Sequence, residues 1–287
     1  MPARNRHSKP IKICPQKAGA LARTVGIETG QADYGVIFMT YCISDIHGCY
    51  DEFMELVEKI DFSPTNDTIY ILGDAIDRGS NSVDCLRFIK KTKGVHLLMG
   101  NHEQMMLDFY DGKDLHGDWY DNGGIIVEKQ LGSIDKAEFE RILSYVRKRP
   151  YYKTVKVNER RFFLSHAGLD FGTPFMYQPK DALLWSRDRF IRHEAIKGYV
   201  CVFGHTPTPY MHGMTGCSVW FDDIHKDKIC IDSACVFGGA LAALRLDDGE
   251  VFYVVSKSKN ESRKFTIDQV PHPENFLQTD KAVLHST

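Results

Sequence analysis

The sequence predicts an α/β fold, with a parallel β-sheet in the first half of the chain and further strands in the second half. From Met39 onward, short apolar runs alternate with segments whose apolar residues recur every three or four positions. That alternation is typical of strands connected by amphipathic helices. After residue 151, strand-like runs follow one another with little helical pattern between them. The second half should therefore be rich in β-structure.

The first half contains three strand-like segments, each followed by a helical segment. In the first helical segment, Phe53, Leu56 and Ile60 are spaced so that they share one face. A βαβαβ order predicts parallel strands joined by right-handed crossovers. The expected strands are 40–44, 68–72 and 95–99, and the expected helices are 50–60, 82–91 and 103–109.

The second half begins with a helical insert, expected at 115–146, and continues mainly with strands. Asp248 and Gly249 lie between the last two strand-like runs, and an Asp-Gly pair favours the tight turn of a β-hairpin. The expected strands are 151–157, 161–165, 199–203, 218–221, 228–231, 240–246 and 251–255.

This regular pattern is continuous, so we expect one folded domain at residues 39–257. Residues 1–38 have no sustained period and mix Pro, Gly, Ala and basic residues, which indicates a disordered extension. Residues 258–287 are mostly polar and are expected to form a C-terminal tail.

The charge balance argues against a nucleic-acid-binding protein. Six of the 36 Lys and Arg residues precede Met39, against two of the 38 Asp and Glu residues, so the remainder of the chain has a net charge of −6. Nucleic-acid binding requires a basic face that replaces the counterions of the phosphates. A mildly acidic body suits a protein that binds divalent cations.

The apolar runs and the cysteines favour a cytoplasmic protein without a membrane partner. No run is long enough to span a membrane, and the N-terminus lacks the pattern of a signal peptide. The eight cysteines form no CxxC pair, and several lie in apolar runs, as Cys42 and Cys201 do. We interpret all eight as reduced, small apolar side chains rather than as a disulfide framework.

Five strand-like runs end in polar motifs. Ligands of open α/β sheets bind at the carboxyl ends of the strands, so these motifs are expected to meet at one edge. A single motif of this kind is weak, but five after successive strands are not a coincidence. They are DIHG at 45–48, GDAIDRG at 73–79, GNHE at 100–103, His166-Ala167-Gly168 and Gly204-His205-Thr206.

Electrostatics indicates that this edge binds two metal ions. Asp45, Asp74 and Asp77 would repel one another and raise their pKa values unless cations offset their charge. Asp45 and His47, two residues apart on extended chain, can bind one ion, and Asp74 can bridge to a second. A rim of salt bridges that uses Arg78 and Arg187 would leave the histidines unexplained.

Together the motifs resemble the signature of the metal-dependent phosphoprotein phosphatases, a branch of the calcineurin-like metallophosphoesterases. The resemblance covers about residues 39–246 and is greatest to the short bacterial and bacteriophage branch typified by lambda phosphatase. It implies two mixed β-sheets between helical layers. Further stretches that carry it are GNHEQMM at 100–106, Trp119 with Asn122-Gly123-Gly124, LWSR at 184–187 and IDSACVF at 231–237.

The resemblance implies a binuclear site and a direct hydrolysis of phosphomonoesters. A hydroxide bridging the two ions would attack phosphorus in line. Manganese is the expected metal, with iron or zinc as alternatives. The ligands implied for the first ion are Asp45, His47 and Asp74, and those implied for the second are Asp74, Asn101, His166 and His205.

The resemblance also implies which residues handle protons and phosphate. His102 would protonate the leaving oxygen, while Asp77 holds its imidazole and favours the protonated form. Arg78 and Arg187 would bind the phosphate oxygens through their planar guanidinium groups. Met99 departs from the pattern, because many relatives have an arginine there that contacts phosphate.

The implied substrates are phosphoserine or phosphothreonine in proteins, with phosphotyrosine or a small phosphoester as alternatives, and we expect a monomer. A rival interpretation is hydrolysis of dinucleoside polyphosphates such as diadenosine tetraphosphate. Enzymes of that kind resemble this chain at DIHG and GNHE but typically lack the aspartate that matches Asp77. A catalytically inactive binding protein is disfavoured, because every implied ligand is present. Trp220 and Phe221 could line the substrate side, although core packing is the simpler interpretation.

Overall fold

The computed structural model describes residues 38–114 and 116–257. The predicted extension at 1–38, apart from Phe38, and the predicted tail at 258–287 lie outside the described residues. In the described part of the chain, no helix is both long enough and apolar enough to cross a membrane.

The first sheet is mixed and has the strand order β10-β9-β1-β2-β3. The strands β1, β2 and β3 are parallel, as the βαβαβ pattern predicts, and β9 pairs antiparallel with both β1 and β10. The predicted hairpin between the last two strands is confirmed, and Gly249 in its turn has a positive φ of 86°. The strands are β1 (Thr40–Ile43), β2 (Thr68–Ile71), β3 (Val95–Leu97), β9 (Ala240–Arg245) and β10 (Val251–Val255).

The second sheet is also mixed and has the order β4-β5-β6-β8-β7. Its three inner strands, β5, β6 and β8, are parallel, and the two outer strands pair antiparallel with them. The strands are β4 (Tyr152–Val157), β5 (Arg160–Ser165), β6 (Val200–Phe203), β7 (Trp220–Phe221) and β8 (Lys228–Cys230). The expectation of two mixed sheets in an α/β protein is confirmed.

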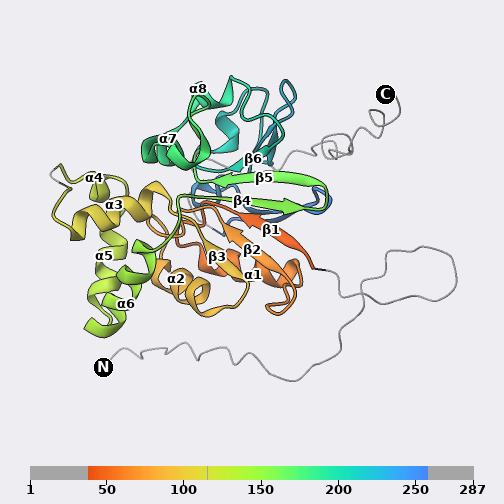
Figure 1. Cartoon of the computed structure of the whole chain (residues 1–287). Coiled ribbons are helices and arrows are strands. Elements are labelled where there is room, and N and C mark those ends of the chain that lie inside the picture. Colours follow the sequence, from red (N-terminus) through yellow and green to blue (C-terminus); the bar gives the residue numbers. More distant parts are fainter. Residues whose placement is uncertain (1–37, 115, 258–287) are drawn as a thin grey trace, which may run out of the picture. The chain divides into compact units, whose positions relative to one another are not determined.

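The two sheets pack face to face, with helices on their outer faces (Figure 1). Side chains of a strand point alternately to its two faces. On β1, Tyr41 and Ile43 accordingly join the core shared with the helices, whereas Cys42 joins the core between the sheets. On the second sheet, Phe163 packs towards the opposite helical side, and its neighbour Leu164 packs between the sheets.

Six helices belong to the first helical side, and the predicted helical insert resolves into the last three of them. They are α1 (Tyr50–Lys59), α2 (Ser82–Lys91), α3 (Asn101–Tyr110), α4 (Asp118–Asp121), α5 (Ile125–Gly132) and α6 (Lys136–Arg147). The start of α3 corrects the prediction, which placed it at Glu103. The Glu103 carboxylate accepts the backbone N–H of Gly100 at 3.0 Å, which allows the helix to begin at Asn101.

Two helices over the second sheet were not predicted, α7 (Lys180–Trp185) and α8 (Asp188–Ile191). Their buried residues, Leu183 and Phe190, pack with Phe163 and Phe203 of the sheet. Three short 3₁₀ turns complete the described part of the chain, η1 (Phe175–Tyr177), η2 (Thr208–Tyr210) and η3 (Cys235–Phe237).

Candidate active site

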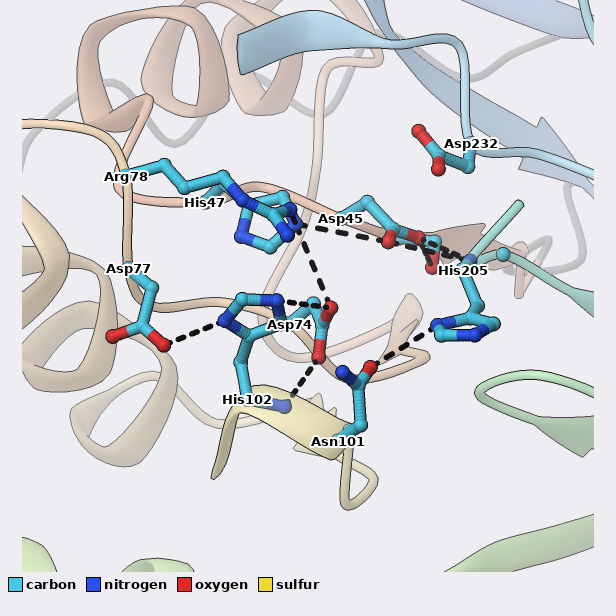
Figure 2. A network of polar contacts seen from close by, with 12 residues as sticks. Asp45, His47, Asp74, Asp77, Arg78, Asn101, His102, His205 and Asp232 are labelled. Carbon is cyan, nitrogen blue, oxygen red and sulfur yellow. Dashed lines mark hydrogen bonds and ion pairs between the residues drawn. The ribbon is translucent and has the colours of Figure 1, made fainter. Parts of the chain in front are cut away.

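The five motifs meet at one edge, beyond the carboxyl ends of β1, β2, β3, β5 and β6. Figure 2 shows residues of the DIHG, GDAIDRG and GNHE motifs together with His205. Ten non-glycine residues of the described chain have a positive φ, and six of them are predicted site residues. Backbone strain of this kind concentrates at functional sites, where the surrounding structure holds it in place. The six, with φ between 45° and 73°, are Asp45, His47, Asp74, Asp77, Arg78 and His205.

The first predicted metal group is assembled around His47. Its Nδ1 lies 2.8 Å from the carbonyl oxygen of Ile76, which can only accept, so Nδ1 carries the proton. Nε2 is then an acceptor, and it faces Asp74 Oδ2 at 3.5 Å and Asp45 Oδ1 at 3.9 Å. All three side chains are almost completely buried. The orientation of the imidazole by a backbone carbonyl is common for metal-binding histidines.

The second predicted metal group is held in the same way. His166 Nδ1 lies 2.9 Å from the carbonyl oxygen of Leu72, so its Nε2 is again an acceptor. That nitrogen lies 2.7 Å from Asn101 Oδ1 and 3.4 Å from Asp74 Oδ2. His205 Nδ1 lies 3.1 Å from the same Asn101 oxygen. Asp74 is the one residue that faces both groups, as the bridging role requires.

The donor set fits divalent cations. His166 Nε2, Asn101 Oδ1 and Asp74 Oδ2 are acceptors that converge on one another, and such an arrangement is unfavourable without a cation. Burial raises the pKa of Asp74 well above its usual range, and the nearby Asp45 raises it further. Burial lowers the pKa of His166, which keeps it neutral. Two groups of side chains have metal-binding geometry here, Asp74-His166-His205 and His47-Asp74-His102. The latter contains His102 where the prediction has Asp45.

His102 and Asp77 form a buried pair next to the metal groups. His102 Nδ1 lies 2.6 Å from Asp77 Oδ2, and its Nε2 points towards Asp74 Oδ2 at 3.7 Å. Burial lowers the pKa of His102, and its neighbours His47 and Arg78 lower it further. This direction is opposite to the protonated imidazole expected beside Asp77, because burial is the largest effect on His102.

Two residues that the sequence analysis did not single out as site residues hold this region together. Trp119 donates its indole N–H to both oxygens of Asp77, at 2.9 and 3.1 Å. Glu103 accepts the backbone N–H groups of Asp74, Ala75 and Gly100 at 2.8 to 3.0 Å. The sequence pointed to them only in that they lie in two stretches that carry the family resemblance, at 119–124 and 100–106.

The two predicted phosphate-binding arginines flank the centre. Arg78 Nη1 lies 2.6 Å from His47 Nε2, and its guanidinium packs over the ring of Phe237 at 5.3 Å. Arg187 is exposed, and its Nη1 donates to Thr206 Oγ1 at 3.1 Å and to the His205 carbonyl oxygen at 3.4 Å. Guanidinium groups on both sides of a metal centre can bind an anion between them.

The structure thus brings together all ten predicted site residues, which are Asp45, His47, Asp74, Asp77, Arg78, Asn101, His102, His166, Arg187 and His205. Met99 is 1% exposed and packs in the first core, so it offers no contact to phosphate. Trp220 is buried in the core under α7 and α8 rather than on the substrate side. The seven described cysteines are free thiols.

Comparisons with known proteins agree with this geometry. The profile of the calcineurin-like phosphoesterase family matches residues 38–238. Serine/threonine-protein phosphatase 2 of Salmonella typhimurium is 30% identical over 181 residues, which are 59% of this chain and 80% of that protein. Symmetrical bis(5'-nucleosyl)-tetraphosphatase of Escherichia coli is 30% identical over 131 residues, 45% of this chain and 43% of that protein. This chain therefore spans less than half the length of the tetraphosphatase.

A solved structure has the same fold. A proposed diadenosine tetraphosphatase superposes with a TM-score of 0.58 and 20% sequence identity, over 77% of this chain and 97% of that one. The superposition supports the fold. At this low sequence identity, it does not identify a substrate.

Proposed function

The chain belongs to the calcineurin-like phosphoesterase family, and from that premise we propose that it is a binuclear metal-dependent phosphatase acting on phosphoserine or phosphothreonine in proteins. The observation that carries this proposal is the buried pair of His102 and Asp77, 2.6 Å apart beside the metal groups. A positioned acid matters most when the leaving group is a poor one, such as the alkoxide of serine or threonine.

In this proposal, the chain's own residues organise the phosphate and the metals. Asp45, His47 and Asp74 hold one ion, and Asp74 with Asn101, His166 and His205 holds the other. When bound, two divalent ions supply Lewis acidity that activates water and offsets the charge developing on the phosphoryl oxygens. Manganese is the metal proposed, on the basis of the resemblance.

The remaining roles belong to side chains beside the metals. Arg78 and Arg187 hold the phosphoryl oxygens from two sides and orient the ester bond. His102 Nε2 gives its proton to the leaving oxygen, and Asp77 fixes the imidazole through Nδ1. Glu103 keeps the two motif loops in register by binding three backbone N–H groups. We further propose a cytoplasmic monomer whose partner is a phosphoprotein or small phosphoester, with residues 39–257 as the catalytic domain.

A second candidate function is hydrolysis of dinucleoside polyphosphates. Identity to the tetraphosphatase is the same 30% as identity to the serine/threonine phosphatase, although over a shorter stretch. Asp77 favours the phosphomonoesterase, because the resemblance implies that the dinucleotide enzymes lack a matching aspartate. The walls of the pocket decide between substrates that share one metal centre.

One assay tests both candidates. The purified full chain, loaded with Mn²⁺, is given a phosphoserine peptide, an aryl phosphate and diadenosine tetraphosphate in separate reactions, each with a chelated sample as control. We expect turnover of the first two substrates and its loss on chelation. Turnover of diadenosine tetraphosphate alone would establish the second candidate. Failure to hydrolyse any of the three would exclude both.

A further inference from the structure

A third group of side chains with metal-binding geometry lies outside the ten site residues. Cys49, Glu52 and Cys235 place their sulfur and carboxylate oxygen atoms within 4.8 Å of one another. Cys49 precedes α1, Glu52 lies in the first turn of α1, and Cys235 begins η3. None of the three belongs to the proposed catalytic centre, whose donors are all oxygen or nitrogen.

The two thiols are in direct contact and differ in accessibility. A hydrogen bond with Cys49 raises the pKa of the Cys235 thiol, and burial raises it further. Cys235 is 2% exposed, whereas Cys49 is partly exposed. Cys49 and Glu52 also line a cavity of about 450 Å³, together with Arg78, Phe237 and Lys257. A small ion therefore has a route from solvent to the group.

The burial of the Glu52 carboxylate cannot be explained by apolar packing, unlike that of a small thiol side chain. Its side chain is 6% exposed, and Oε1 accepts the backbone N–H of Lys257 at 2.7 Å. Within residues 38–114 and 116–257, no basic side chain forms an ion pair with Glu52; the Lys257 ammonium pairs with Glu55 and acts on Glu52 through its charge, without such a contact. A buried carboxylate that no cation contacts directly is costly. Two thiols beside it add soft ligands for a cation.

We propose that Cys49, Glu52 and Cys235 form a site for a soft divalent cation of the zinc and cadmium class. Zinc takes four ligands in a tetrahedron, with sulfur at about 2.3 Å and carboxylate oxygen at about 2.0–2.2 Å. The three side chains supply three ligands, and water from the cavity supplies the fourth. Thiolate ligands select these ions over manganese or magnesium, which prefer oxygen.

The site would connect two segments that carry catalytic residues. Cys49 follows the DIHG motif directly, and its Sγ lies 3.8 Å from the carbonyl oxygen of His47. Cys235 follows the loop with Asp232, a buried carboxylate next to the centre (Figure 2). An ion bound by both cysteines would tie these loops together, so its binding should raise the unfolding temperature.

Cadmium titration of the full chain tests the site. The Mn²⁺-loaded protein is reduced with a phosphine, carries Cys14→Ser to remove a cysteine outside the described residues, and is titrated with CdCl₂. Thiolate-to-cadmium charge transfer in the ultraviolet distinguishes a thiol site from the proposed catalytic centre, whose ligands include no sulfur. We expect the band to saturate at one cadmium per chain, with a rise in unfolding temperature. MgCl₂ should give neither effect.

Variants distinguish cadmium binding at this site from cadmium binding at other cysteines. Cys235→Ser and, as a second variant at a partly exposed position, Cys49→Ser should each abolish the saturable band. Glu52→Gln keeps both thiols and should weaken cadmium binding at least about tenfold, as loss of a metal-binding partner does. A band that is missing from the parent protein at one equivalent, or that survives in both serine variants, would overturn the proposal.

Discussion

The indole N–H of Trp119 donates to both carboxylate oxygens of Asp77, at 2.9 and 3.1 Å, although 42 residues separate them in the chain. Trp119 is fully buried and packs against the rings of Phe109 and Tyr110. Asp77 in turn lies 2.6 Å from Nδ1 of His102. The tryptophan therefore positions the carboxylate that positions the proposed general acid.

Replacing Trp119 with phenylalanine should impair catalysis by the proposed general acid His102 more than it lowers the stability of the fold. The variant keeps an aromatic ring and removes the N–H, so Asp77 becomes free to rotate away from His102. We expect kcat on a phosphoserine peptide to fall about tenfold or more, and by no more than the 10²–10⁴-fold that general acid catalysis contributes. Hydrolysis of p-nitrophenyl phosphate, whose leaving group needs no proton, should fall much less.

Trp220→Phe is the matched control, since it makes the same change in a buried tryptophan of the core under α7 and α8. It should reduce stability without changing the ratio of kcat on the phosphoserine peptide to kcat on p-nitrophenyl phosphate. An equal loss on both substrates in Trp119→Phe would mean that Trp119 only supports the fold.

His102→Asn should slow hydrolysis of the phosphoserine peptide by about 10²–10⁴-fold while both metals remain bound. The reason is that the proposed metal ligands do not include His102, although its Nε2 points towards Asp74. Metal content by elemental analysis and kcat on the two substrates are the measurements. His96→Asn, an exposed histidine on β3, serves as the control. Loss of a metal ion from His102→Asn would show that this histidine is a ligand.

The sequence predicted the first sheet well and the supporting contacts poorly, for physical reasons. The parallel strands have a strong apolar period, and their motifs follow them directly. The helices α7 and α8 are six and four residues long, too short for a helical period to develop. The contact between Trp119 and Asp77 depends on how α4 packs against the GDAIDRG loop at 73–79. No local sequence pattern predicts this packing. Met99 is buried, so it cannot bind phosphate.

Metal binding should release protons and become tighter as the pH rises. Burial and the neighbouring Asp45 raise the pKa of Asp74, so protons compete with metal for this carboxylate at a higher pH than for an exposed one. Binding of Mn²⁺ to the chelated protein can be measured by calorimetry in buffers of different ionisation enthalpy. Heats that are independent of the buffer would contradict proton release. Asp74→Asn should abolish most of the released protons along with tight binding.

Glu103→Gln should change how the stability of the metal-free protein depends on pH. Burial, followed by the charge of Asp74, raises the pKa of Glu103 from 4.5 to about 7. A raised pKa means that the fold disfavours the ionised form, so the contribution of Glu103 to stability is complete below about pH 4.5 and is lost as the pH rises through about 7. The shift corresponds to about 3 kcal/mol, at 1.36 kcal/mol for each pKa unit.

Glutamine remains neutral, so it cannot lose stability in this way. It also has one carbonyl oxygen to accept from three backbone N–H groups, which costs about 1–3 kcal/mol at every pH. In urea unfolding of the chelated proteins, the variant should be less stable at pH 5, and the difference should shrink or reverse by pH 8. A constant difference between the two proteins over this range would refute the assignment. With Mn²⁺ bound, the nearby positive charge should stabilise ionised Glu103 and remove the pH dependence.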